Sequence, residues 1–174
     1  MTDVANVVVT YLELRASADA VARTRETTAA PFVLHRERAP TAASVAAALY
    51  AQVGAPWHWT DRLPWAAADW RRAINRDDVE LWVARIADAI VGYFELQVER
   101  DAIELRYFGL LPEFTGCGLG ARLLSAAVER AWAVGKDRMT VNTCTLDHPA
   151  ALAGYLKRGF TVLRTEARGQ GFTA

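Results

Sequence analysis

The stretch "LLPEFTGCGLGARLLSAAVERAW", from Leu110 to Trp132, decides the fold of this chain. Three glycines at positions 116, 118 and 120 follow an apolar run typical of a strand and precede an amphipathic run typical of a helix. Three explanations are open: a tight turn that needs positive φ angles, a dinucleotide-binding fingerprint, or a cradle for the pyrophosphate of another ligand.

The sequence around these glycines argues against two nucleotide-binding patterns, the dinucleotide fingerprint and the P-loop. Gly116-x-Gly118-x-x-Ala121 formally fits the dinucleotide fingerprint, but too few residues follow to complete a doubly wound sheet. The next strand, "RMTVNTC", ends without the acidic residue that holds a ribose, and no Gly-Lys-Ser/Thr forms a P-loop. A pyrophosphate cradle needs only glycines and the unpaired N–H groups that open a helix.

Hydrophobic periodicity predicts one α/β (α+β) domain with a mixed, mostly antiparallel sheet flanked by helices. Residues 1–31 read as an N-terminal strand followed by a linker or arm, and residues 32–174 as the main domain. We expect strands over Asn6–Leu14, Phe32–Arg38, Asp78–Asp88, Ala89–Arg100, Asp101–Leu111, Asp137–Thr145 and Gly159–Arg168, and helices over Pro40–Gly54, Ala66–Asn75, Gly118–Val134 and His148–Arg158.

The composition excludes several classes of protein. The 174 residues carry a formal net charge of zero, which disfavours a nucleic-acid or membrane partner held by bulk electrostatics. Two cysteines make neither a disulfide framework nor a metal site, so we expect no metal. Without a signal-peptide pattern or a long apolar run, the expected location is cytoplasmic.

A second motif, "TLDHPAALAGYLKRGF" (Thr145–Phe160), follows the glycine-rich turn. The two motifs, in this order and spacing, resemble those of the GNAT superfamily of acyl-CoA-dependent N-acyltransferases. The resemblance extends over Ile103–Val162, and the preceding hairpin is consistent with it. Thr115 departs from the family's Arg or Gln before the first glycine, and His148 stands where the family has Asn.

The resemblance implies acetyl-CoA as co-substrate, bound beside a strand that splays from its neighbour. Main-chain groups of Phe108, Gly109 and Leu110 would bind the pantetheine arm, with a bulge at Gly109 opening the slot for the thioester. Cys117 is a bystander in the loop because no base is adjacent. The implied pyrophosphate contacts are Gly116, Cys117, Gly118, Leu119, Gly120 and Ala121, and His148 is a further cofactor contact.

Acyl transfer to an amine needs a general acid and a general base. The resemblance implies Tyr155 as the acid that protonates the leaving thiolate; its alternative role is a core tyrosine. Glu104, on the strand before the cradle, is the candidate base, with an outward-facing strand residue as its alternative. Glu95 on the adjacent strand is the second candidate base.

A tryptophan-rich segment, "APWHWTDRLPW", lies where the resembled fold shapes the acceptor site. Trp57 and Trp59 suit a pocket for a cation or an apolar chain, or a small core under a loop. Asp61 could contact an acceptor ammonium and Arg62 an acceptor carboxylate, or the two could pair with each other. The predicted activity is acetyl transfer from acetyl-CoA to an amine; a non-catalytic acyl-CoA-binding module is the alternative, and a homodimer is possible by analogy.

Overall fold

The computed structural model describes residues 7–17 and 31–168. Its strands are β1 (Val7–Arg15), β2 (Val33–Glu37), β3 (Val79–Ile86), β4 (Ala89–Val98), β5 (Ile103–Leu110), β6 (Arg138–Cys144) and β7 (Thr161–Arg168). Its helices are α2 (Ala42–Gly54), α3 (Ala67–Ile74), α4 (Leu119–Ala133) and α5 (Ala151–Arg158), with short 3-10 turns η1 (Ala55–Trp57) and η2 (Pro112–Phe114). Each expected strand and helix has its counterpart among these elements.

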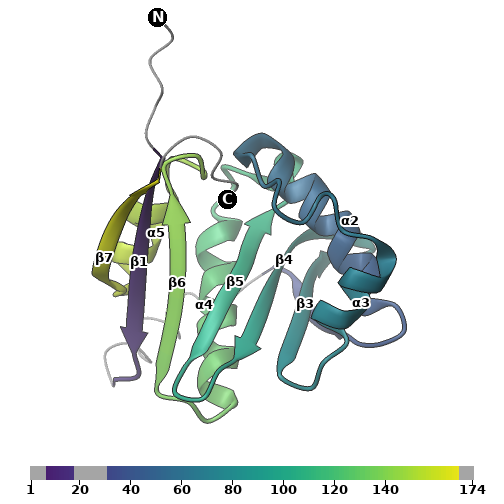
Figure 1. Cartoon of the computed structure of the whole chain (residues 1–174), viewed down its shortest axis with the longest axis horizontal. Coiled ribbons are helices and arrows are strands. Elements are labelled where there is room, and N and C mark those ends of the chain that lie inside the picture. The colour runs from purple at the N-terminus through teal and green to yellow at the C-terminus, as the bar shows by residue number, and fades with distance from the viewer. Residues whose placement is uncertain (1–6, 18–30, 169–174) are drawn as a thin grey trace, which may run out of the picture.

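The strands form one mixed sheet in the order β2-β3-β4-β5-β6-β1-β7, in which only β5 and β6 run parallel. Figure 1 shows α4 passing behind the central strands and α2 and α3 beside β3 and β4. The α/β fold with a mostly antiparallel sheet and flanking helices is therefore confirmed. Among the described residues, no helix is long and apolar enough to cross a membrane.

The two faces of the sheet have separate cores because successive strand residues point to opposite sides. On β4, Phe94 and Leu96 belong to the core that packs under α4, together with Leu123. Tyr93 belongs to the core under α2 and α3, together with Leu49. The alternation that predicts a strand thus also assigns each side chain to one of two helical layers.

The N-terminal strand occupies a position that the sequence did not predict. β1 lies between β6 and β7 and is antiparallel to both, so β7 is joined to the sheet only through β1. Leu12 is fully buried in the α4-side core. β1 is therefore part of the same sheet as the rest of the chain, while the expected linker over Arg15–Pro31 lies largely outside the described residues.

The expected splay exists, but its cause is not the one we expected. β5 and β6 pair only from Ile103 to Leu105, although both strands continue beyond that point. The register shift between β4 and β5 lies at Glu95/Leu96, opposite Arg106, and Gly109 remains in register with Tyr93. The expectation of a bulge at Gly109 is wrong: the strands part three residues before it.

Candidate active site

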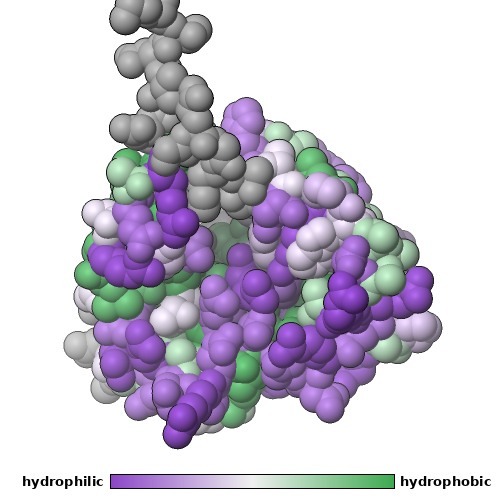
Figure 2. All heavy atoms as spheres, viewed as in Figure 1, coloured by the Kyte–Doolittle hydropathy of each residue, from purple (hydrophilic) through white to green (hydrophobic). Residues whose placement is uncertain are grey.

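A cavity of about 860 Å³ opens where β5 and β6 part. Figure 2 shows the surface hollowed between the β6 side and the α2 side of the molecule. The cavity reaches both faces of the sheet, since its wall includes α4 and α5 on one side and the η1 segment on the other. Of the predicted site residues, its lining includes Trp57, Trp59, Glu104, Phe108, Gly109, Leu110, Gly116, Gly118, Gly120, Ala121, His148 and Tyr155.

The glycine-rich turn leaves the start of α4 open. Gly116 and Gly118 have φ angles of 79° and 77°, a region that costs other residues about 1–2 kcal/mol. No side chain caps the helix, and an added Cβ at either glycine would meet nothing within 4 Å. The N–H groups of the first turn therefore have no side-chain cap, and the glycines before them leave room for an anion.

The predicted cradle is held from the other side by α5. Arg158 is buried, and its Nη2 donates a hydrogen bond of 2.7 Å to the carbonyl oxygen of Ala121. Two predicted cradle residues, Cys117 and Leu119, do not line the cavity: Cys117 is exposed and Leu119 packs into the core. Any contact of Leu119 with a ligand would be limited to its main chain.

The end of β5 provides a strand edge beside the cavity. Beyond Leu105, β5 pairs with β4 on one edge and has no β6 partner on the other. A Cβ at Gly109 would lie 2.4 Å from Cγ1 of Val53 in α2. A side chain at position 109 would therefore clash with the Val53 methyl group unless Val53 moved.

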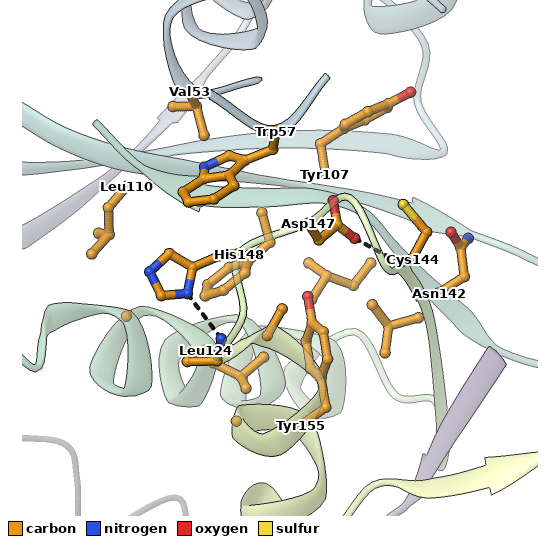
Figure 3. Close-up of a pocket in the computed structure, with 18 of the residues that line it drawn as sticks. Val53, Trp57, Tyr107, Leu110, Leu124, Asn142, Cys144, Asp147, His148 and Tyr155 are labelled. Atoms are coloured by element: carbon orange, nitrogen blue, oxygen red, sulfur yellow. Dashed lines mark hydrogen bonds between the residues drawn. The ribbon is translucent and has the colours of Figure 1, made fainter. Parts of the chain in front are cut away.

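Tyr155 meets the requirements of a cavity acid. Its side chain is 6% exposed and its ring contacts those of Phe108 and Phe160 at 6.3 and 5.6 Å between centroids. Figure 3 shows its hydroxyl pointing toward the turn that carries Asp147 and Cys144. Burial, assisted by the negative charge of Asp147, raises the pKa of Tyr155 above 10, so the phenol stays protonated at neutral pH.

Glu104 lies in the same cavity, on the part of β5 that still pairs with β6. Arg106 Nε lies 3.7 Å from its carboxylate. Burial raises the pKa of Glu104, and the Arg106 charge opposes this shift without cancelling it. A carboxylate with a raised pKa accepts a proton more readily near neutral pH than an ordinary glutamate does.

Asp147 is a cavity residue that the sequence analysis missed. It accepts hydrogen bonds from Trp59 Nε1 at 3.2 Å, Thr143 Oγ1 at 2.6 Å and the Cys144 N–H at 2.9 Å. The Trp59 bond joins the η1 segment to the β6–α5 turn, which are far apart in the sequence. No local sequence pattern predicts this role for Asp147, because one of its three hydrogen-bond donors, Trp59, comes from a distant part of the chain.

His148 strengthens this connection between the two segments. Its ring lies 4.9 Å from that of Trp57, and its Nδ1 accepts a hydrogen bond from the Ala150 N–H. Figure 3 shows the two rings next to each other, and their planes meet at 63°, an edge-to-face arrangement. The histidine therefore lies in the turn that precedes α5, in the position of the family's asparagine, and also contacts the tryptophan-rich segment.

Arg62 and Glu95 do not belong to the cavity wall. Both side chains are 2% exposed and form a two-pronged ion pair with N–O distances of 2.7 and 3.0 Å. The guanidinium also lies 4.2 Å from the ring centroid of Tyr107. The structure does not support their predicted roles as acceptor contacts or base, and it places the partner of Arg62 at Glu95 and not at Asp61.

Asp61 instead faces the cavity and is held by two tyrosines. It accepts a hydrogen bond of 2.6 Å from the Tyr107 hydroxyl and another from the Tyr50 hydroxyl. The rings of Tyr50, Trp59 and Tyr107 contact one another at centroid distances of 5.2–5.6 Å. We refer to Tyr50, Trp59, Asp61 and Tyr107 as the Asp61 wall. Within the described ranges, no three His, Cys, Asp or Glu side chains gather where they could hold a metal ion.

Comparisons with known proteins identify a family and a shared fold. A model of the Acetyltransferase (GNAT) family matches residues 45–160. No curated protein matches the chain. Among solved structures, a GCN5-related N-acetyltransferase from Sphaerobacter thermophilus superposes with a TM-score of 0.67 at 12% identity, covering 97% of this chain and 54% of that protein. This chain thus spans about half of that protein's length.

Two further solved structures match a larger share of their own chains. An aminoglycoside acetyltransferase from an uncultured soil metagenomic sample has a TM-score of 0.64 and 15% identity, with 82% of this chain and 96% of that one covered. A GNAT family acetyltransferase from Elizabethkingia anophelis, solved with acetyl-CoA bound, has a TM-score of 0.60 and 18% identity over 77% and 78% of the two chains. At these identities the likeness establishes the shared fold.

Proposed function

Since the chain belongs to the Acetyltransferase (GNAT) family, we propose that it transfers an acetyl group from acetyl-CoA directly to a primary amine within a ternary complex. The observation that carries this proposal is the single cavity that joins an open helix N-terminus, a strand edge and a buried tyrosine. Acetyl-CoA is bound in a structural neighbour, which supports the choice of co-substrate.

The proposed binding mode uses the main chain. The N–H groups from Gly116 to Ala121 would bind the pyrophosphate, and the β5 edge at Phe108–Leu110 would bind the pantetheine arm. Neither contact needs the side chains in which this chain departs from its family, Thr115 and His148. The cradle is therefore expected to bind the co-substrate despite both departures.

The chemistry requires two proton transfers. The amine nitrogen forms a bond to the thioester carbonyl carbon, the carbon–sulfur bond breaks, and the thiolate leaves with its electron pair. Glu104 would take the amine proton through a water molecule, and Tyr155 would give its proton to the thiolate. The Leu110 N–H is our candidate for stabilising the oxyanion that forms between these steps.

Calorimetric titration with acetyl-CoA and then with CoA tests the co-substrate, and thiol release on addition of amines tests the transfer. We expect both molecules to bind and thiol release to depend on the amine. Binding without amine-dependent release would favour a non-catalytic acyl-CoA-binding module. Absence of binding by either molecule would refute the cradle and the activity together.

A further inference from the structure

The Asp61 wall lies on the α2 face of the sheet, beside the strand edge proposed for the thioester. Tyr107 precedes Gly109 by two residues, about 7 Å of extended chain, and Trp59 packs on Tyr107. Asp61, Trp59 and Tyr107 all line the cavity. The wall is therefore a neighbour of the reacting centre and not part of the cofactor cradle.

The Asp61 carboxylate is held in place by hydrogen bonds and can still accept further hydrogen bonds from a ligand. The Tyr50 and Tyr107 hydroxyls occupy two of the about four lone-pair positions of its carboxylate. The residue is exposed and lines the cavity together with the rings of Trp59 and Tyr107. A carboxylate among aromatic faces binds an organic cation through both charge and cation–π attraction.

The cations near this wall are already engaged. Arg62, which lies against the Tyr107 ring, is paired with Glu95. Arg106 lies 3.7 Å from Glu104 and 4.0 Å from Glu95. The remaining basic residues of the cavity, Lys157 and Arg158, come from α5 beside the cradle. Positive charge thus lies toward the cofactor end of the cavity, and the Asp61 wall is anionic.

We propose that Asp61 determines acceptor specificity by binding a second, non-reacting ammonium group, so that the preferred acceptors are diamines or larger polycationic amines. This inference rests on the proposed acetyl transfer, because it concerns the acceptor of that reaction. Tyr107 and Tyr50 act as positioning residues, since their hydroxyls hold the carboxylate against the aromatic faces. A single ammonium group, once deprotonated for attack, leaves no cation for Asp61 to bind.

The test compares 1,5-diaminopentane with 1-aminopentane, which differ in one terminal amine. We expect kcat/KM to be at least about tenfold higher for the diamine, since one hydrogen bond between charged groups is worth about tenfold or more. Asp61→Asn should lower kcat/KM for the diamine about tenfold more than for the monoamine, so that the preference is lost. Asp77→Asn, an exposed aspartate outside the cavity, is the matched control and should keep the preference.

A binding measurement separates this inference from the proposed activity. Both amines are titrated into the CoA-saturated protein and into its Asp61→Asn variant by calorimetry. If the diamine binds more tightly than the monoamine to the wild type but not to the Asp61→Asn variant, the result supports Asp61 as an ammonium-binding residue, whether or not turnover is detected. Equal binding and equal turnover of the two amines would overturn the inference while leaving acetyl transfer intact. Absence of thiol release with every amine would refute the activity instead.

A positioning variant strengthens the assignment. Tyr107→Phe keeps the aromatic face but removes the hydroxyl that holds Asp61 at 2.6 Å. It should raise KM for the diamine and leave kcat and the monoamine KM nearly unchanged. A fall in kcat for both amines would instead assign Tyr107 to the chemistry and contradict its positioning role.

Discussion

The two ends of the cavity differ in the chemical groups that form them: main-chain groups at one end and side chains at the other. The proposed cofactor end is the main chain of one continuous segment, from Phe108 to Ala121, which combines an unpaired strand edge with a helix start left open by glycines. The acceptor end is made of side chains from distant segments, such as Tyr50, Asp61 and Asp147. A main-chain site tolerates many substitutions but fails when a glycine is lost, whereas a side-chain site can be changed one residue at a time.

The largest expected effect is at the main-chain end. Gly118→Asp should abolish binding of acetyl-CoA in calorimetry, because it adds an anion and a side chain in the space proposed for the pyrophosphate. Since nothing surrounds Gly118 within 4 Å, the effect comes from the lost ligand space and from charge, and not from a clash within the protein.

Gly135→Asp is the matched control for this substitution. Gly135 also has a positive φ angle, 88°, and open space around it, but it lies at the opposite end of α4. Both variants should lose similar stability from the unfavourable φ angle, about 1–2 kcal/mol. Retained binding in Gly118→Asp, or equal loss in both variants, would contradict the cradle.

The next largest effect concerns the support of the acceptor end. Arg62→Leu leaves the Glu95 carboxylate buried without its partner and should cost about 3–5 kcal/mol of unfolding free energy in urea denaturation. The double variant Arg62→Leu/Glu95→Leu should recover much of this loss. Arg76→Leu, which removes an exposed ion pair with Asp78, should change stability little. Equal effects of the two arginines would disprove a structural role for the buried pair.

A smaller effect is expected for the proposed acid. Tyr155→Phe should lower kcat about a hundredfold, because general acid catalysis contributes about that much or more, and should leave the Kd for acetyl-CoA nearly unchanged. Because its pKa is raised, Tyr155 should cause no alkaline loss of activity below pH 10. Tyr11→Phe, whose hydroxyl donates to Glu166 outside the cavity, is the control. Normal turnover in Tyr155→Phe would remove this residue from the mechanism.

The smallest effect is expected at Glu104, since a base that acts through water is partly replaceable. Glu104 must be ionised to accept the proton, so kcat/KM should fall as the pH falls through its pKa, which burial raises above 4.5. Glu104→Gln should lower the rate about tenfold at neutral pH. It should also remove this fall in kcat/KM at low pH, the acidic limb of the pH profile.

Glu99→Gln tests whether the ionisation of Glu104 causes the acidic limb of the pH profile. The Glu99 charge contributes to the raised pKa of Glu104, so its removal should move the acidic limb to lower pH without changing the rate at pH 8. An acidic limb that persists unchanged in Glu104→Gln would assign the base to another group.

The sequence predicted the fold well because its signals are local. Alternating residues in β3, β4 and β5 and glycines at the ends of α4 and α5 report backbone conformation within a few residues. The predicted cavity residues between Phe108 and Ala121 and at Tyr155 were implied by the resemblance to the GNAT superfamily, and most of them line the cavity. One kind of failure arose where a side chain had two chemically equivalent partners.

Arg62 is the clearest of these cases. Its neighbour Asp61 and the distant Glu95 are both carboxylates, and the sequence offers no means of choosing between them. In the fold, the Tyr50 and Tyr107 hydroxyls donate hydrogen bonds to Asp61. Arg62 pairs instead with Glu95, and its guanidinium lies against the Tyr107 ring. Similarly, β1 has an ordinary strand pattern, and only the assembled sheet places it between β6 and β7.

By itself, then, the sequence determined the order of strands and helices, the glycine-opened helix start and the tyrosine of α5. These depend on φ angles and on periodicities of a few residues, which each segment carries alone. Only the tertiary structure decided where β5 and β6 part, which carboxylate pairs with Arg62, and that Asp61 and Asp147 face the cavity. Those outcomes depend on burial and hydrogen bonding between segments that meet only after the chain has folded.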